Sequence, residues 1–435
     1  MLKKVAAAGG AVVIALCWPF ATGQVGERIY LDTVGKYDSP YVSITNANYD
    51  RGYLSSDAVS RIEIKDAFKA IFEDEGLPTV WYIEHKVKHG LFGVSSVSSL
   101  VLDEAFQPIA NDLWGDGVAP ITFTTSTALT RKTDFNITIN PVSYMEETGT
   151  KADIKAFVME GTVDAEGASE FRYRLPEAKI ITLADEAMVM KGFVGGGKGV
   201  LDGQFWIGSQ NFSLNSVSFI DQVNDKSVDV EDVTLAMSNT LTQPDPASDI
   251  AEQHLTNLNT VTIAKIISLD GEEFSNFNFK MAFADLNYRA ISRLGDMADE
   301  LDDQMTAEQA KEASLALDLL VAKGLTFNLE DLSVTTPQGD VKSNINVVIA
   351  PGIARASENI AQITDKLSGQ INLILPQAIV DEDPILSEKA AMMEQGGVVV
   401  KESGQYKMQL QIDGDQIVLA SGEQLPLAML LMLFM

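Results

Sequence analysis

The apolar residues of segment 325–349 follow a rhythm that predicts a bent β-hairpin. In its first half they fall at i, i+2, i+5 and i+7, at Phe327, Leu329, Leu332 and Val334. A regular strand alternates with a period of two, so one extra residue is needed near positions 330–331. A β-bulge supplies such a residue and adds twist and bend. Residues 337–339, Pro-Gln-Gly, then predict the turn between the two strands.

The same rhythm recurs along the chain and indicates one type of strand used repeatedly. The copies are Val42/Ile44/Ala47/Tyr49, Ile137/Ile139/Val142/Tyr144, Tyr173/Leu175/Ala178/Ile180, Phe212/Leu214/Val217/Phe219 and Val228/Val230/Val233/Leu235. Bent strands placed side by side make a concave surface with apolar residues on one side. We therefore predict an α+β fold dominated by a large, curved antiparallel sheet of bulged strands. The candidate concave apolar face comprises Phe212, Leu214, Val217, Phe219, Phe327, Leu329, Leu332 and Val334.

The pattern changes from strand to mixed helix and strand after residue 286. Segments 287–303, 306–323, 356–367 and 383–395 predict helices that pack against the same sheet. Thr306 followed by Gln309 matches a capping box, and Gly324 suits the end of that helix. We expect one body over residues 24–435, mainly β over 24–286 and mixed over 287–435.

Residues 1–23 predict a membrane anchor. Lys3 and Lys4 precede an uncharged run at 5–20, which is close to the length that spans a bilayer as a helix. The expected membrane contacts are Val5, Val12, Val13, Ile14, Leu16, Trp18 and Phe20. The lysines favour the cytoplasmic side, so we expect a single-pass inner-membrane protein with its body in the periplasm. A signal peptide cleaved after the small residues at 21–23 and a lipoprotein acylated at Cys17 are the alternatives.

The net charge and the cysteine count exclude one class of partner and one kind of covalent link. The formal net charge is −29, from 61 acidic and 32 basic residues, and such a surface repels phosphate backbones. We therefore expect no nucleic-acid partner. Cys17 is the only cysteine, so no disulfide can form within the chain.

No residue set in the sequence predicts catalysis, a cofactor or a metal site. The glycine-rich segment 192–199 resembles a phosphate loop, but Gly199 stands where Ser or Thr should follow Lys198. We interpret it as the tip of a hairpin. His85 and His89 are four residues apart on an expected strand, without a third ligand nearby. We expect a protein that is not an enzyme.

Two non-catalytic functions remain open. The concave apolar face could hold a lipid or another hydrophobic guest for cell-envelope maintenance. Alternatively, the body is a tethered scaffold that recruits a protein partner through its Met392–Met393 segment or the apolar residues 426–435. Those ten residues are too few to span a bilayer.

Short motifs give the chain a resemblance to the YdgA-like bacterial family of unknown function. The turn at 49–56, YDRGYLSS, contributes Tyr49, Arg51, Gly52, Ser55 and Ser56 to the family pattern, and KHGLFG contributes His89 and Gly90. Segment 407–425 resembles the final strand pair of that family. Leu91 departs from the proline that often follows His-Gly there. The resemblance implies a retained membrane segment and an exported body, and it implies no activity or cofactor.

Overall fold

The computed structural model describes residues 42–52, 54–74, 76–90, 93–145, 149–202, 205–242, 252–299, 306–358 and 361–429. The described chain is mostly antiparallel β-sheet with few helices, and the sheet is open. It divides into two compact units, and the points along the chain at which one unit ends and the other begins lie within β11 and β12. The expected anchor residues at positions 5–20 and the tail at 430–435 lie outside the described residues.

Unit 1 holds the described residues up to Val200, together with Phe219–Asp225. Two helices accompany its strands, α3 (Asp66–Asp74) and α4 (Phe106–Trp114). The strands are β1 (Val42–Arg51), β2 (Ser55–Ile64), β3 (Val80–His89), β4 (Gly93–Leu100), β5 (Ile121–Ala128), β6 (Thr133–Ile139), β7 (Val142–Met145), β8 (Lys151–Ile154), β9 (Phe157–Val163), β10 (Ser169–Ile181) and β11 (Glu186–Asp202).

The strands of unit 1 pair antiparallel, in the order β1–β2–β3–β4–β5–β6–β9–β10–β11. The short hairpin of β7 and β8 extends this sheet, because β8 also pairs with the second half of β10. Two apolar clusters form its core. One centres on Ile62 and Val87, with Phe68 and Phe72 of α3 packed against it, and the other centres on Phe123, Phe135 and Ile137.

Unit 2 holds residues 201–202, residues 205–218 and the described residues from Lys226 onward. Its strands are β12 (Phe205–Asp221, whose end belongs to unit 1), β13 (Lys226–Leu241), β14 (His254–Ile267), β15 (Glu273–Asn287), β16 (Leu325–Thr336), β17 (Gly339–Ile349), β18 (Leu367–Pro376), β19 (Val399–Glu402), β20 (Gln405–Asp413), β21 (Gln416–Leu419) and β22 (Gln424–Pro426). Its helices are α5 (Tyr288–Asp299), α6 (Ala307–Ala322), α7 (Ala361–Thr364), α8 (Gln377–Glu382) and α9 (Pro384–Gln395).

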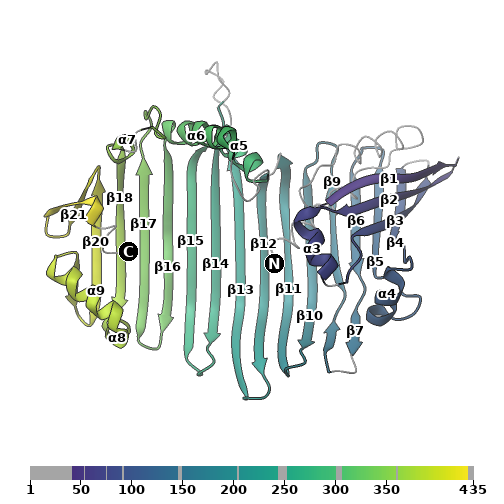
Figure 1. Ribbon diagram of the computed structural model, residues 1–435, viewed down its shortest axis with the longest axis horizontal. Helices are drawn as coiled ribbons and strands as arrows, with labels where there is room; N and C mark the ends of the chain where they lie inside the picture. The colour runs from purple at the N-terminus through teal and green to yellow at the C-terminus, as the bar shows by residue number, and fades with distance from the viewer. Residues whose placement is uncertain are drawn as a thin grey trace. The chain divides into compact units, whose positions relative to one another are not determined.

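Seven long strands of unit 2 pair antiparallel in the order β13–β14–β15–β16–β17–β18–β20. Helices α5 and α6 lie across one end of these strands, and α8 and α9 lie beside β18 and β20 (Figure 1). The helix begun by Thr306 has the expected capping box, with Gln309 N donating to Thr306 Oγ1 at 3.2 Å. Gly324 follows α6 with a φ of 81°, as its C-terminal position requires. The helix expected over 356–367 is reduced to α7, because residues from Leu367 onward pair with β17.

Two of the expected β-bulges are confirmed by the strand register. Between β16 and β17 the register shifts between Leu329 and Leu332, at the two residues expected to carry the bulge. Between β1 and β2 it shifts between Asn46 and Asn48, so Ala47 is the extra residue. In both strands the extra residue lets apolar side chains before and after it face the same way.

At 137–144 and 173–180 the expectation of an inserted residue is wrong. Ile139 of β6 faces Phe157 of β9, and Val142 of β7 faces Ile154 of β8. Two residues lie between these pairs on each side, 140–141 and 155–156, so neither side gains a residue and the register is unchanged. Farther along, β10 keeps one register with β11 on either side of Pro176. The pleat is therefore broken at one level across neighbouring strands, at residues 140–141, 155–156, 176 and 192. We call this transverse break the crease of unit 1.

A similar break explains the apolar rhythm at 228–235 in unit 2. Glu231 faces Lys265 and Val233 faces Ile263, so β13 gains no residue relative to β14. Asp232 between them has a φ of 49°, and Asn276 of β15 has a φ of 52°. At Asp232 the alternation of side chains is interrupted without an extra residue relative to β14, whereas around Asn276 strand β15 gains one residue relative to β16, between Ser275 and Asn278. Asp and Asn are among the residues that tolerate the left-handed conformation.

Candidate binding face

The side chains of unit 2 separate onto two faces of different polarity. One register line crosses all seven long strands through Met237, Asn259, Met281, Leu329, Ile345, Ile371 and Leu410. The next line on the same face runs through Leu235, Val261, Phe279, Leu332, Ser343, Leu373 and Met408. We call the surface made by these two lines and their continuation the apolar face.

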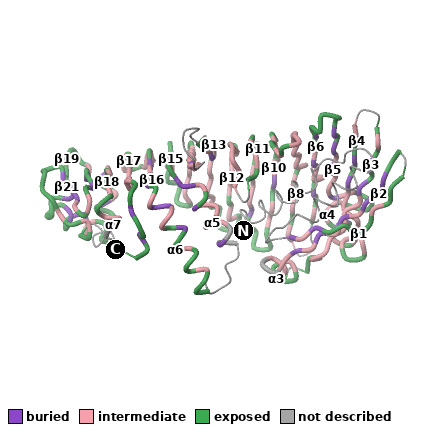
Figure 2. Tube along the Cα trace, turned by 90° about the horizontal axis from the view of Figure 1, so that it is seen from above, coloured by how far each residue is buried: buried purple, intermediate pink, exposed green. Residues whose placement is uncertain are grey.

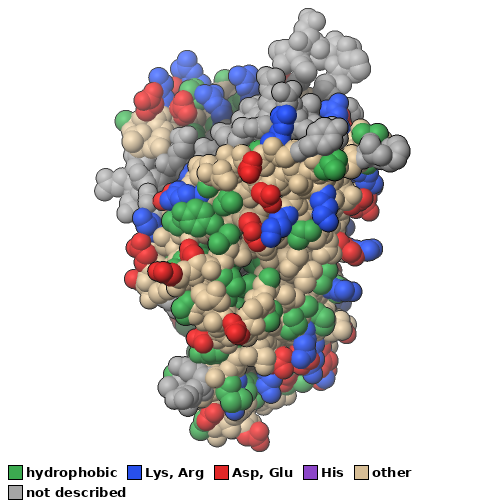
Figure 3. All heavy atoms as spheres, turned by 90° about the vertical axis from the view of Figure 1, so that its right-hand side faces the viewer, with side chains coloured by type: hydrophobic (Ala, Val, Ile, Leu, Met, Phe, Trp, Pro, Cys, Tyr) green, Lys and Arg blue, Asp and Glu red, His purple; other side chains and the backbone are tan. Residues whose placement is uncertain are grey.

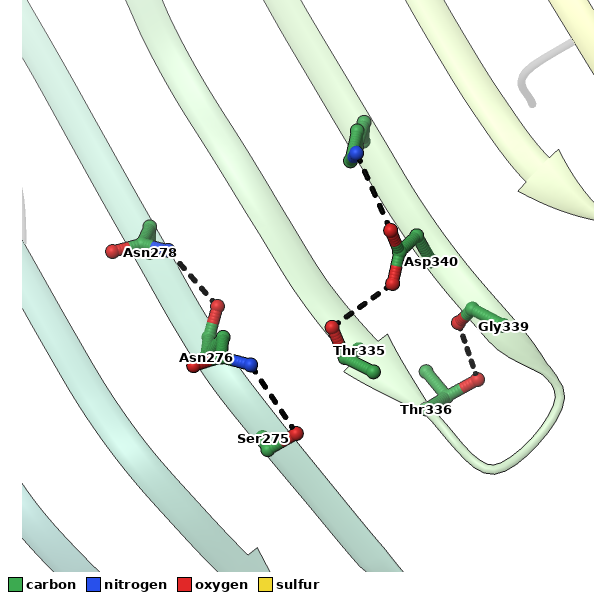
Figure 4. A network of polar contacts seen from close by, with 8 residues as sticks. Ser275, Asn276, Asn278, Thr335, Thr336, Gly339 and Asp340 are labelled. Carbon is green, nitrogen blue, oxygen red and sulfur yellow. Dashed lines mark hydrogen bonds and ion pairs between the residues drawn. The ribbon is translucent and has the colours of Figure 1, made fainter.

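The opposite face carries polar side chains in the same strands. One of its register lines is Thr234, Thr262, Asn278, Ser333, Lys342, Ile374 and Lys407. Figure 4 shows part of this polar face, where Thr335 Oγ1 donates to Asp340 Oδ1 at 2.9 Å and Lys342 lies 3.3 Å from Oδ2. The bond from Thr335, followed by Lys342, lowers the pKa of Asp340. One-sided polarity of this kind indicates that only one face of the sheet is built to contact apolar groups.

Helices cover the apolar face at two places. At one end of the strands, the cluster around Leu255, Leu286, Ala290 and Leu320 brings α5 and α6 against Leu241, Phe283 and Leu325. At β18 and β20, Val380 of α8 and Met393 of α9 belong to a buried cluster with Met408 and Leu410. Both clusters are ordinary hydrophobic cores, so these parts of the face are already occupied.

Between the covered parts, the apolar face is only partly shielded. In β13–β17 its residues Leu235, Val261, Phe279, Leu332 and Ile345 are all of intermediate exposure, whereas the corresponding Met408 and Leu410 of β20 are buried. Figure 2 shows the strands from β15 to β17 mainly in the colour of intermediate exposure. We call this region, from β13 to β17 and beyond the edge of α5 and α6, the open part of the apolar face.

The residues expected to form a concave face are placed in two groups. Phe327, Leu329, Leu332 and Val334 of β16 all lie on the apolar face, and Leu329 is buried there. Phe212, Leu214 and Val217 of β12 are half-buried and belong to unit 2. Phe219, at the end of the same strand, belongs to unit 1 and is 51% exposed.

A cluster of three asparagines on the apolar face was not predicted from the sequence. Asn239, Asn257 and Asn259 lie side by side on β13 and β14, joined by hydrogen bonds of 2.6 and 2.5 Å. The signal was available in the alternation of segment 255–263, LTNLNTVTI, which places Asn257 and Asn259 in phase with Val261 and Ile263.

The motif residues that carry the family resemblance come together in unit 1. Arg51 faces Ser56 across the β1–β2 turn, where Gly52 N donates to Ser55 O at 2.8 Å. His89 ends β3, its Nε2 lies 3.1 Å from Ser56 Oγ, and its backbone N–H donates to Leu54 O at 2.8 Å. The motif therefore builds two consecutive hairpin turns and the bond that joins them.

Glycine is required at both turns. A Cβ atom on Gly52 would lie 2.6 Å from Ser55 O, and one on Gly90 would lie 2.9 Å from Gly93 O. Gly90 N also donates to that oxygen at 2.8 Å. Tyr49, the first residue of the motif, is half-buried against the Ile62 cluster. The structure gives these residues a role in shaping the fold.

His85 lies beside this motif in a buried polar network. Its Nε2 is 2.8 Å from Ser60 Oγ and its Nδ1 is 2.7 Å from Ser98 Oγ. Burial lowers the pKa of His85 to about 4. The ring is thus neutral at pH 7, with one nitrogen donating and the other accepting. Its neighbours are serines, and the ring is 2% exposed, so the arrangement suits packing better than attack on a substrate.

The glycine-rich segment and the metal-ligating residue types remain to be placed in the structure. The glycine-rich segment 192–199 is inside strand β11 and pairs with β10, so its interpretation as a hairpin tip is wrong. A Cβ on Gly196 would lie 2.4 Å from Phe171 O, which explains glycine within the strand. Over the residues that the structure describes, no cluster of His, Cys, Asp and Glu could hold a metal ion. On the face shown in Figure 3, Lys and Arg side chains are interspersed with Asp and Glu side chains.

No helix among the described residues is both long and apolar enough to cross a membrane. Comparison with known proteins gives one match. The model of a bacterial protein family of unknown function, DUF945, matches residues 1–428. Neither the curated proteins nor the solved structures contain a significant match to the chain. Because the family model covers nearly the whole chain, this protein belongs to the DUF945 family of bacterial proteins of unknown function.

Proposed function

We propose that this protein holds an elongated apolar ligand, such as the acyl chain of a lipid, on the open part of the apolar face, and that it performs no catalysis. The observation that carries the proposal is the partial exposure of Leu235, Val261, Phe279 and Ile345 on a face that is buried under helices at β18 and β20. Because helices cover the apolar face only at one end of the strands and at β18 and β20, we propose that the ligand binds to the open part of that face.

The dimensions of the open part suit an acyl chain. The five strands β13–β17 are separated by four inter-strand spacings, or roughly 19 Å. One leaflet of a bilayer holds acyl chains within about 15 Å. Burial of about ten methylene groups contributes on the order of 8 kcal/mol before the cost of association is subtracted.

The location of the protein is part of the proposal. The uncharged run at 5–20, preceded by Lys3 and Lys4, supports an inner-membrane anchor with the body in the periplasm, as in the YdgA-like pattern. A body tethered beside a bilayer would meet lipids at high local concentration. The proposed role is therefore lipid binding for cell-envelope maintenance.

The test uses two neighbouring residues of β14 that lie on opposite faces. Val261 is on the apolar face and Thr260, which faces Lys280, is on the other. Full-length protein purified without detergent, or extracted and transferred to lipid nanodiscs, is analysed by native mass spectrometry for bound lipid. We expect Val261→Lys to lose the bound lipid and Thr260→Lys to retain it. Wild-type protein that carries no lipid and takes up no added fatty acyl probe would overturn the proposal.

A second function, a scaffold for a protein partner, has its own observation. On α9, Ile385 is 68% exposed and Met392 is 51% exposed, while the adjacent Met393 is buried at 8%. The exposed side of α9 thus carries two large apolar side chains beside the exposed Glu388, and we propose these two side chains as the contact for a partner. Ile385→Ser with Met392→Ser should abolish capture of a partner while leaving lipid content and melting temperature unchanged.

A further inference from the structure

Three asparagines on β13 and β14 form a directed hydrogen-bond relay on the apolar face. Asn239 Nδ2 donates to the backbone carbonyl of Trp206 at 2.9 Å, Asn257 Nδ2 donates to Asn239 Oδ1 at 2.6 Å, and Asn259 Nδ2 donates to Asn257 Oδ1 at 2.5 Å. All four residues belong to unit 2. The relay runs from one strand to the next and ends at Asn259.

The direction of the relay is fixed by its first member. The carbonyl of Trp206 can only accept, so Asn239 must turn its Nδ2 toward it and its Oδ1 toward Asn257. The same reasoning then applies to Asn257 and to Asn259. The relay therefore ends in Asn259 Oδ1, an acceptor to which no described residue donates, and in the second N–H of Asn259 Nδ2 beside it.

Asn259 occupies an isolated position among apolar side chains. It faces Met237 on one side and Met281 on the other, and it is the one polar residue in the line that crosses seven strands from Met237 to Leu410. Asn259 is of intermediate exposure, so its Oδ1 is accessible to a donor group of a bound ligand. Donation along a chain of amides also polarises the terminal oxygen and strengthens it as an acceptor.

The relay lies at the boundary of the open part of the apolar face. Along β14, Leu255 is buried under α5 and α6, Asn257 and Asn259 follow, and Val261 and Ile263 then continue into the open part. The distance from Asn259 to Ile263 is roughly 13 Å at the usual rise of a strand. A polar group held at Asn259 would thus direct an attached chain away from the helices and along the sheet.

Charge decides which polar group fits there. The residues that face Asn259 are methionines, so no basic side chain of the paired strands stands opposite it, and the chain as a whole carries −29. A carboxylate or phosphate could accept only the second N–H of Asn259 Nδ2, and no basic side chain of the paired strands would balance its negative charge. A hydroxyl or an amide N–H would donate to it directly.

We infer that Asn259 selects the ligand of the apolar face, and that this ligand is an uncharged amphiphile whose polar group donates a hydrogen bond. A monoacylglycerol or a fatty acid amide has this chemistry, and a fatty acid anion does not. The inference rests on the proposed function, because it names the class of lipid that the same face would hold.

The experiment compares three probes of equal chain length on full-length protein in nanodiscs: a monoacylglycerol, the corresponding fatty acid methyl ester and the fatty acid anion. The methyl ester is neutral but has no donor. We expect wild-type protein to bind the monoacylglycerol about tenfold more tightly than the ester. Asn259→Leu should abolish that preference while leaving the affinity for the ester unchanged.

The matched control is Asn344→Leu on the polar face, where Asn372 Nδ2 donates to Asn344 Oδ1 at 2.8 Å. It should leave the preference intact. If Asn259→Leu does not fold, Asn259→Ser is used instead. The shorter serine side chain places its oxygen too far from the ligand to accept the hydrogen bond, and it is a smaller substitution. Equal binding of monoacylglycerol and ester by the wild type, or an unchanged preference in the Asn259 variant, overturns the inference and leaves the proposed function standing. Failure of all three probes to bind overturns both.

Discussion

The Nδ1 atom of His85 lies 2.7 Å from the Oγ atom of Ser98, and both side chains are buried, at 2% and 1% exposure. His85 holds β3 to β2 through Ser60 and to β4 through Ser98. A neutral ring can satisfy both serines, whereas protonation would place a positive charge on a ring that is removed from water.

The free energy of unfolding of unit 1 should therefore decrease as the pH is lowered through a defined window. The pKa of His85 is about 4 in the folded protein and about 6.5 in an unfolded chain. Between these pH values the unfolded state binds more protons than the folded state. Lowering the pH therefore stabilises the unfolded state and destabilises the folded protein. We expect a loss of up to about 3 kcal/mol between pH 6.5 and pH 4.

Urea denaturation at a series of pH values measures this loss, with His85→Gln as the comparison. The Gln variant should be less stable at pH 7 but should show a flatter profile between pH 6.5 and pH 4. Identical slopes for both proteins in that window would contradict the prediction.

Gly52 should not tolerate a side chain, because a Cβ would approach Ser55 O to 2.6 Å. Gly52→Ala must either open the β1–β2 turn or break the bond between Gly52 N and Ser55 O, and we expect it to cost about 1–3 kcal/mol. Thermal denaturation followed by circular dichroism gives the change.

The control for this substitution is Gly396→Ala, just after α9, where the nearest atom would lie 3.5 Å from the added Cβ. That variant should melt within a few degrees of the wild type. A Gly52→Ala protein as stable as the Gly396→Ala protein would mean that the turn is not constrained as described.

Deletion of Glu330 should be tolerated better than deletion of a neighbouring residue. The β16–β17 register shifts between Leu329 and Leu332, so removal of one residue there restores plain alternation and keeps Leu332 and Val334 on the apolar face. The ion pair between Lys280 and Glu330 is lost, but exposed pairs of this kind contribute little.

Deletion of Ser333, beyond the bulge, supplies the comparison, since it moves Val334 to the polar face. We expect the Ser333 deletion to lower the melting temperature by far more than the Glu330 deletion. If the two deletions are equally damaging, the bulge is not what keeps the apolar residues of β16 in phase.

Thr306 should contribute about 1 kcal/mol to unit 2 through its capping box. Its side chain accepts from Gln309 N at 3.2 Å, and Gln309 Oε1 accepts from Thr306 N at 2.9 Å. Thr306→Ala removes the first of these bonds, while Thr306→Ser retains it. Denaturation midpoints should place the Ser variant close to wild type and the Ala variant below it, and an Ala variant equal to wild type would show that the cap is dispensable.

Several features of the fold were predictable because they depend on residues close together in the chain. The Thr306–Gln309 box marked the start of α6, and residues 337–339 marked the turn after β16. The spacing of Leu329 and Leu332 located a bulge within two positions. In each of these cases the signal and the structure it specifies lie within one turn or one strand.

The same local rhythm misled the analysis at Val142 and Ala178. A strand that gains one residue and a strand that crosses the crease of unit 1 leave the same apolar spacing in the sequence. What distinguishes them is whether the neighbouring strand breaks at the same level. That depends on pairing between β6, β9 and β10, which no single segment specifies.

The sequence by itself determined which residues of each strand are apolar, because burial of one side of a strand demands alternation at short range. Only the tertiary structure decided that Met237, Asn259 and Met281 share one line, and that helices cover this line at β18 and β20 but not between β13 and β17. Register between strands and the docking of helices depend on contacts between segments far apart in the chain. The proposed lipid site and its asparagine acceptor arise from those contacts.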